Sequence, residues 1–243
     1  MLDAKAEILK HTQAALEYGA RIDLQTHPIE MDFNGGALTL EGEVPNIGCK
    51  KLALEVASSV QGVRSIIDRL RVTPEERAGD GAIRDAVCKH FLGDVDFHNC
   101  GLRVLKKGQI EALRDPMGDD SSGSVVVSVD DGVVTLAGQV ISLSHKRLAG
   151  VLAWWARGCR DVVNLLEVIP PEEDNDDEVA DALRLVLETD PLVPSSQIGI
   201  RTHDHVVTLD GVVATQEEKM RAEMDAWRLF AVRDVINRIE VRP

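Results

Sequence analysis

Aromatic side chains, positive charge and long apolar runs are all scarce in this 243-residue sequence. It contains 4 Phe, 3 Trp and 1 Tyr, and its 27 Lys and Arg stand against 41 Asp and Glu, for a formal net charge of -14. So acidic a chain repels phosphate backbones, and so few rings leave little for base stacking, which excludes nucleic acid as the expected partner. No apolar run approaches the roughly 18 residues that a transmembrane helix needs.

Cysteine is scarce as well, and the sequence contains no CxxC pair. The four cysteines are Cys49, Cys88, Cys100 and Cys159. Their scatter indicates neither a disulfide framework nor a zinc ribbon. The first residues lack the continuous apolar stretch of a signal peptide, so we expect a cytoplasmic protein. Because we find no nucleophile elbow, phosphate loop, zincin helix or dinucleotide fingerprint, we expect no enzyme, no metal and no cofactor.

What the sequence does contain is one pattern that occurs three times. The segments 37–42, 133–138 and 206–211 read ALTLEG, VVTLAG and VVTLDG, and Lys follows the last Gly of each by eight residues. The middle copy carries 23 extra residues between about 98 and 124. We therefore divide the chain into unit 1 (1–74), unit 2 (75–171, with the insertion at about 98–124) and unit 3 (172–243).

Each unit is predicted to run helix, strand, strand, helix, strand. The predicted helices are 4–16, 81–92 and 177–187 at the start of the units and 47–60, 144–156 and 216–229 farther along, where apolar residues recur at helical spacing. A tight turn joins the first two strands, and the third strand follows the second helix. A strand–helix–strand crossover makes the second and third strands parallel. The expected fold class is α+β: three tandem α-β-β-α-β units, each a mixed three-stranded sheet with two helices packed on one face.

This order of elements, together with its motif residues, resembles the BON domain family (bacterial osmotically inducible protein Y and nodulation). Unit 2 matches the family pattern best, through Gly132, Gly138, Lys146, Gly158 and Asn164. The resemblance implies a non-enzymatic module, usually in the bacterial envelope, that binds phospholipid or supports membrane integrity under osmotic stress. It thus implies a periplasmic location as the alternative. A cytosolic relative senses potassium, which implies a cation-binding sensor as the alternative function.

The motif glycines Gly42, Gly138 and Gly211 are the first candidate site residues. Glycine at a strand end commonly marks a bend or the close approach of another backbone, and we favour that structural interpretation. Because matching residues matter functionally in the family that the sequence resembles, we also keep the three glycines as candidate binding residues.

An apolar stripe on the second helix of units 2 and 3 supplies further candidates. Its residues are Val151, Trp154, Trp155, Met220, Met224 and Trp227. Unit 1 is polar at the corresponding positions. Since an apolar surface stripe usually marks an interface, two interpretations stay open. Either units 2 and 3 pack together through it, which we favour, or it binds a lipid, a protein partner or a second copy of the chain.

The insertion and two pairs of possible metal ligands complete the candidates. The insertion is locally basic, with Arg103, Lys106 and Lys107, and either docks an acidic partner or is a decorated surface loop that ends in a flexible stretch at 118–124. Zinc is not expected at Cys88 and His90, which point about 200° apart on a helix. For His203 and His205, which flank a turn, turn chemistry is the better interpretation.

The sequence as a whole therefore predicts a non-enzymatic binding or scaffolding protein linked to osmotic or envelope stress. Its predicted ligand is a phospholipid head group or a protein partner, with self-association as an open alternative.

Overall fold

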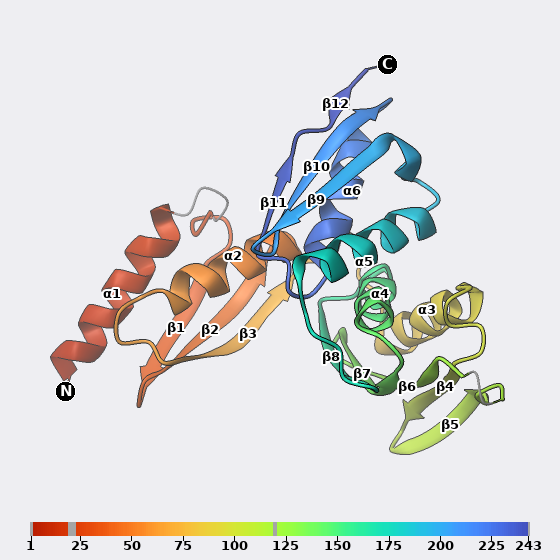
Figure 1. Ribbon diagram of the computed structural model, residues 1–243. Coiled ribbons are helices and arrows are strands. Elements are labelled where there is room, and N and C mark those ends of the chain that lie inside the picture. The colour runs from red at the N-terminus through yellow and green to blue at the C-terminus, as the bar shows by residue number, and fades with distance from the viewer. Residues whose placement is uncertain (1, 19–22, 119–120, 243) are drawn as a thin grey trace. The chain divides into compact units, whose positions relative to one another are not determined.

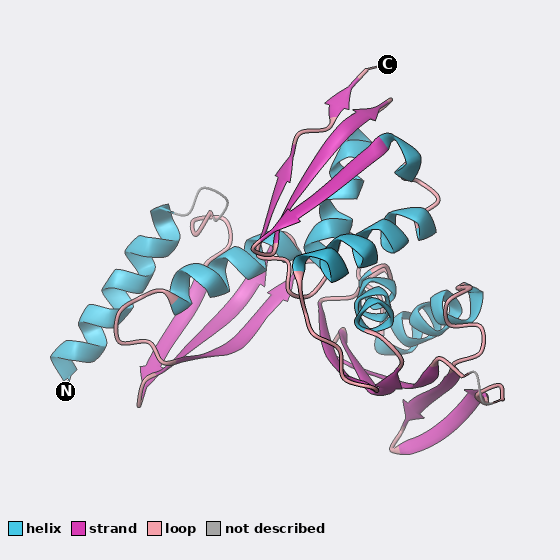
Figure 2. Cartoon of the chain, in the orientation of Figure 1, coloured by secondary structure: helices cyan, strands magenta, loops and turns pink. Residues whose placement is uncertain are grey.

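The computed structural model describes residues 2–18, 23–118 and 121–242, and the chain divides into two compact bodies, Met1–Thr73 and Pro74–Pro243. Each body combines helices with mixed sheets, as Figures 1 and 2 show, so the predicted α+β class is confirmed. None of the helices in the described ranges is long and apolar enough to cross a membrane.

The first body contains five elements in the predicted order. They are α1 (Leu2–Tyr18), β1 (Ile29–Asn34), β2 (Ala37–Val44), α2 (Ile47–Ser58) and β3 (Ser65–Val72). β1 pairs antiparallel with β2, and β3 pairs parallel with β2 on its other side. α2 begins where the side chain of Asn46 accepts a hydrogen bond from the backbone N–H of Cys49, a standard N-cap. Alternate strand residues such as Leu38 and Leu40 are fully buried under the helices, and the opposite face of the sheet is open.

The second body contains two such sheets. Its first half comprises α3 (Asp80–Gly93), β4 (Gly101–Lys106), β5 (Gln109–Arg114), β6 (Gly123–Asp130), β7 (Val133–Val140), α4 (Leu143–Trp154) and β8 (Asp161–Val168). Its second half comprises α5 (Asp176–Thr189), the short 3-10 helix η1 (Ser195–Gln197), β9 (Ile198–His203), β10 (Val206–Val213), α6 (Gln216–Arg228), β11 (Asp234–Asn237) and β12 (Glu240–Val241). The strand orders are β5-β4-β6-β7-β8 in the first sheet and β9-β10-β11 in the second, with β12 continuing β11 along β10.

The insertion is not the surface loop that the sequence predicts, because it builds two strands. β4 pairs parallel with β6, and β5 forms an antiparallel hairpin with β4, which widens the predicted three-stranded sheet to five strands. The physical reason is the alternation in β4, where Leu102 and Val104 are buried while Arg103 is exposed. Nor is the end of the insertion a flexible stretch: Ser122 is buried and Gly123 begins β6, while 119–120 lie outside the described residues.

Each motif glycine lies on a strand at a point where the backbone of the neighbouring segment approaches closely. Gly138 has φ +124°, and a Cβ built there would lie 2.1 Å from the carbonyl oxygen of Ser124. Gly211 is equivalent, with its Cβ 2.1 Å from the carbonyl oxygen of Gln197, and at Gly42 the corresponding distance is 2.7 Å. Every side chain other than hydrogen is therefore excluded at these positions, which explains the repeated glycine without a ligand.

The Lys and Asn of the repeated pattern tie the second helix to the last strand. In unit 1 the ammonium of Lys50 donates to the carbonyl of Leu70 and lies 3.0 Å from Asp68, and the ammonium of Lys219 likewise donates to the carbonyl of Ile239. The amide of Asn164 donates to the carbonyl of Lys146 on α4 over 2.7 Å. These positions therefore hold the unit together.

Candidate functional site

The structure places most of the predicted apolar helix stripe inside the second body. Val151 is fully buried, Trp227 is 1% exposed, and Trp154 and Trp155 are half-buried where α4 packs against α5 and α6. The indole Nε1 of Trp155 donates to Oδ1 of Asp225 on α6 over 2.9 Å. This geometry fits the interpretation that units 2 and 3 pack together through the stripe.

The outer end of the stripe is more open. Met220 is 53% exposed on α6, and Met224, one turn farther along, is half-buried. These two residues are the part of the stripe that a partner could reach, and they form a smaller apolar surface than the sheet described next.

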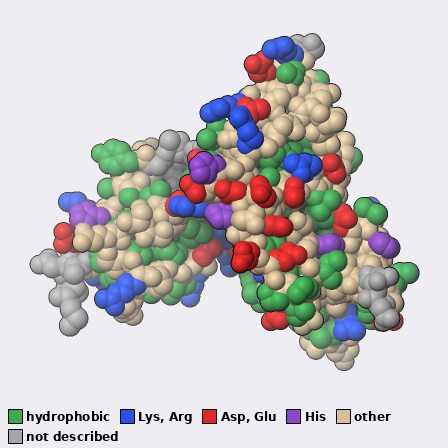
Figure 3. Space-filling view, viewed as in Figure 1, with side chains coloured by type: hydrophobic (Ala, Val, Ile, Leu, Met, Phe, Trp, Pro, Cys, Tyr) green, Lys and Arg blue, Asp and Glu red, His purple; other side chains and the backbone are tan. Residues whose placement is uncertain are grey.

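A second group of exposed apolar residues lies on the side of the five-stranded sheet that the helices do not cover. We call it the open face of unit 2. Its apolar residues are Leu105 on β4, Ile110 and Ala112 on β5, Val126 on β6, Ala137 on β7, and Val163 and Leu165 on β8. The same face also carries Arg103 and the polar residues Ser124, Ser128, Thr135, Gln139 and Glu167. Ile110 is 62% exposed and Leu165 58%. Figure 3 shows hydrophobic side chains gathered over the β7–β8 end of this sheet.

The register makes one row of this open face continuous across the sheet. Val126 pairs with Ala137, and Ala137 pairs with Leu165. On the other side, Val126 pairs with Arg103, which pairs with Ala112. Directly paired residues point to the same face, so the row is apolar everywhere except at Arg103.

The same row in unit 1 is charged. At the positions equivalent to Val126, Ala137 and Leu165, unit 1 has Glu30, Glu41 and Arg69, which pair with one another in the same register. The guanidinium of Arg69 lies 3.3 Å from the carboxylate of Glu41.

Unit 3 is charged at this place as well. Asp210 stands where Ala137 stands in unit 2, and its carboxylate pairs with Arg201 on the neighbouring strand. This row is thus charged in units 1 and 3 and apolar in unit 2, so the fold does not require it to be apolar.

Positive charge borders the open face at the β4–β5 hairpin. Lys106 and Lys107 are exposed at its tip, and Arg103 lies on the open face itself. The nearest acid, Glu111, lies 3.8 Å from the ammonium of Lys106. The acidic run EEDNDDE at 172–178 lies elsewhere, leading into the first turn of α5. Of the predicted basic residues, the structure therefore places Arg103 on the open face, Lys107 at the hairpin turn beside it, and Lys106 on the opposite side of the hairpin.

Sequence reasoning missed the apolar part of this face: Leu105, Ile110, Val126, Val163 and Leu165. A signal for it exists in the continuous runs 125–127, 162–163 and 165–166. A strand with one solvated face alternates apolar and polar residues, whereas a continuous apolar run indicates two apolar faces.

A cluster of possible metal ligands at Asp176, His203 and Asp204, whose ligand atoms lie within 4.8 Å of one another, is explained by turn chemistry. The carboxylate of Asp176 accepts the backbone N–H groups of Asp204 and His205, each at 2.8 Å. These hydrogen bonds, with that from His205 as the largest cause, lower the pKa of Asp176.

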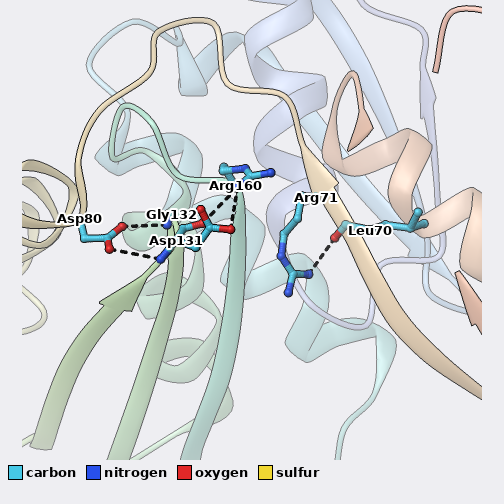
Figure 4. Close-up of polar contacts among 6 residues, drawn as sticks. All are labelled: Leu70, Arg71, Asp80, Asp131, Gly132 and Arg160. Atoms are coloured by element: carbon cyan, nitrogen blue, oxygen red, sulfur yellow. Dashed lines mark hydrogen bonds and ion pairs between the residues drawn. The ribbon is translucent and has the colours of Figure 1, made fainter. Parts of the chain in front are cut away.

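Asp80 makes the equivalent pair of hydrogen bonds in unit 2, with the N–H groups of Asp131 and Gly132, while Arg160 pairs with Asp131 (Figure 4). The same figure shows the guanidinium of Arg71 donating to the carbonyl of Leu70 in the first body. An aspartate in the first turn of a helix therefore closes the strand turn in both units of the second body, and no metal is needed to account for it.

The Cys88 thiol is no better candidate for a metal ligand, because burial raises its pKa to about 11.

A strand pair followed by a crossover helix and a parallel third strand, with glycine at the strand contact, defines a class of small α+β modules. The BON domain model matches residues 5–74, 110–170 and 175–243, and the chain belongs to the BON domain family. The recognised family is thereby confirmed.

Among characterised relatives, the Osmotically-inducible protein Y of Escherichia coli is 30% identical over 127 residues, which cover 50% of this chain and 63% of that protein. The match thus spans less than two thirds of the relative. Two solved structures of CdsD, a structural protein of the type III secretion system of Chlamydia trachomatis, are each 14% identical. They cover 97% and 98% of this chain, with TM-scores of 0.24 and 0.25. These TM-scores are too low to support a conclusion about this chain.

Proposed function

We propose that this protein is a non-enzymatic binding protein of osmotic or envelope stress, built of three BON units at 1–74, 75–171 and 172–243. Its family membership and its similarity to an osmotically inducible protein support this role. We further propose that the open face of unit 2 and the adjoining β4–β5 hairpin bind a phospholipid surface.

The observation that carries this proposal is the apolar row in unit 2 at positions where unit 1 carries ion pairs. Apolar side chains on a flat, uncovered sheet face are costly in water and usually mark an interaction surface. Leu105 and Ile110 would bury in the acyl–headgroup boundary of a bilayer, while Arg103 on the same face and Lys107 at the hairpin turn would contact the lipid phosphates. The chain's net charge of -14 weakens the attraction to anionic lipid, but the acids around α5 are distant in sequence from the hairpin.

Co-sedimentation of the full chain with phosphatidylcholine vesicles, with and without phosphatidylglycerol, tests this proposal. We expect the chain to pellet with the anionic vesicles, and Leu165→Gln to weaken this binding about tenfold, because one buried leucine contributes about 1.5 kcal/mol or more. Lys107→Gln should lessen the dependence of binding on salt.

Ile67→Gln is the matched control, since Ile67 is an exposed apolar residue on the open face of unit 1. It should bind vesicles as the unchanged chain does. The proposal is wrong if the unchanged chain pellets with neither composition, or if Ile67→Gln weakens binding as much as Leu165→Gln. If the open face of unit 2 bound a protein and not vesicles, the protein-partner interpretation would replace the phospholipid one.

A further inference from the structure

The outer edge of β9 in unit 3 has no strand paired with it among the described residues. β9 pairs with β10 on its other side, and Figure 1 shows it at one edge of its sheet. The backbone N–H and C=O groups along such an edge form a template on which another extended segment can pair. Proteins commonly cover or blunt an edge of this kind, so an open one needs a physical account.

Alternate residues of β9 direct their backbone groups toward this edge. The N–H of Ile198 donates to the carbonyl of Ser195 in η1, which precedes β9, so it points away from β10. In an antiparallel pair, residues that bond to the partner strand alternate with residues that do not. The backbone groups of Ile200 and Thr202 therefore point away from β10 as well.

The same edge is covered in unit 2, where β4 pairs parallel with β6. β6 is the equivalent of β9, because Val125 and Ile198 each lie thirteen residues before the motif glycine. Leu102 and Val104 of β4 are 1% and 2% exposed, whereas Arg103 between them lies on the open face. Unit 2 thus shows how this fold accepts an added strand: parallel, with a basic residue between two buried apolar ones.

A groove of about 270 Å³ lies beside β9 in unit 3, between this strand and α5. Leu187 on α5 and Ile198 and Ile200 on β9 supply its apolar lining. In unit 2 the equivalent helix and strand, α3 and β6, have β4 packed against them. Ile200 is half-buried, whereas its equivalent Val127, next to β4, is fully buried. The groove is therefore where the apolar side chains of an added strand would lie.

Unit 1 fills the corresponding place with its own side chains. At the equivalents of Ile200 and Thr202 it has Met31 and Phe33, which have longer side chains. Both pack against the core of unit 1, together with Leu24 from the preceding loop. Unit 3 has neither an inserted strand nor these longer side chains, which explains why the groove occurs there.

The open face of unit 3 beside this edge favours a basic residue in the added strand. In the register of β4 on β6, the central residue of that strand pairs with Gly199, the equivalent of Val126. A Cβ at Gly199 would meet no atom closer than 3.6 Å, so the space above it is free. The next residue in the same row is Asp210, whose carboxylate also pairs with Arg201. Residues 172–243 as a whole contain 17 acids and 8 bases, so positive charge is attracted here.

We propose that the β9 edge of unit 3 binds an extended segment of a protein partner, which adds to the sheet parallel to β9 and carries a basic residue between two apolar ones. The apolar side chains occupy the groove at α5, and the basic one lies over Gly199 toward Asp210. Backbone hydrogen bonds to Ile200 and Thr202 hold the segment. The site lies on a different sheet from the open face of unit 2 and does not depend on lipid binding.

A peptide with the sequence of β4, GLRVLK, tests the proposal, because it already has the required pattern. Fluorescence anisotropy of the labelled peptide would measure its binding to the full chain, and NMR would measure the exchange of backbone amides. We expect binding to slow exchange at Ile200 and Thr202, while Gly199 and Arg201, whose amides bond to β10, stay unchanged. The peptide GLQVLK, which lacks the central charge, should bind about fivefold more weakly.

Two variants of the chain examine the backbone and the charge separately. Ile200→Pro should weaken binding of GLRVLK at least tenfold, because proline removes an N–H at the edge that the β9–β10 pairing does not use. Met31→Pro, at the equivalent position of β1, is the matched control and should leave binding unchanged. Asp210→Ala gives unit 3 the residue that unit 2 has at position 137, so the fold tolerates it, and it should make GLRVLK and GLQVLK bind equally.

Several outcomes would overturn the proposal. They are no binding of GLRVLK to the unchanged chain, full binding to a folded Ile200→Pro, and equal weakening by Met31→Pro. If Ile200→Pro does not fold, Asp210→Ala decides, and a persisting preference for GLRVLK over GLQVLK overturns the site. A dimer of the unchanged chain that Ile200→Pro converts to a monomer in sedimentation would show that the edge binds a second copy instead. Leu165→Gln should leave peptide binding unchanged, so this site and the proposed lipid surface hold or fail separately.

Discussion

Gly138→Ala is expected to destabilise the second body by about 3 to 5 kcal/mol, one of the two largest effects that we predict. The new Cβ would lie 2.1 Å from the carbonyl oxygen of Ser124, and that backbone atom cannot move without breaking the β6–β7 pairing. The φ of +124° adds strain for any residue with a side chain.

Urea unfolding, followed by circular dichroism, measures this loss. Gly93→Ala at the end of α3 is the control, because a Cβ there meets no atom within 4 Å. It should change the free energy of unfolding by less than about 1 kcal/mol. Equal effects of the two substitutions would contradict the steric explanation of the motif glycine and would reopen the interpretation of Gly138 as a binding residue.

Trp227→Ala should cost about 3 to 5 kcal/mol, because it removes the largest fully buried side chain of the second body. Trp227 lies on α6 and is 1% exposed, so its loss opens a cavity inside the second body. Differential scanning calorimetry of the full chain should show a lowered transition for the second body and an unchanged one for the first.

Met220→Ala is the matched control on the same helix stripe, since Met220 is 53% exposed. Its effect on the free energy of unfolding should stay within about 0.5 kcal/mol. If Trp227→Ala changed the free energy of unfolding as little as Met220→Ala, the stripe would not be holding units 2 and 3 together. The interpretation of Trp227 as part of a partner surface would then be favoured.

The repeated fold could be predicted from sequence because each local signal repeats three times. ALTLEG, VVTLAG and VVTLDG each end in a glycine that the strand contact requires, and helical spacing brackets them on both sides. The last strand of unit 3 was less predictable, because it is divided into β11 and β12, whereas the equivalent strands β3 and β8 are continuous.

The insertion was misjudged because local composition dominated the prediction. Lys106, Lys107 and Gly108 indicate a turn, and they do form one, but the strands on either side depend on partners distant in sequence. β4 pairs with β6, although β5 lies between the two strands in the sequence. The guanidinium of Arg114 donates to the carbonyl of Cys100. A parallel pairing of this kind leaves no periodic mark that connects its two strands.

The sequence by itself determined the α-β-β-α-β order, the BON family and the place of each motif glycine, because those features depend on residues a few positions apart. Only the tertiary structure decided which apolar residues are buried. Val151 and Trp227 read as surface residues on their own helices, and packing between helices buries them. Leu165 and Leu166 are identical in type, and the register of β8 turns Leu165 outward while Leu166 is buried. The scarcity of positive charge and aromatic rings likewise describes the whole chain, whereas folding brings the basic hairpin beside an apolar sheet face.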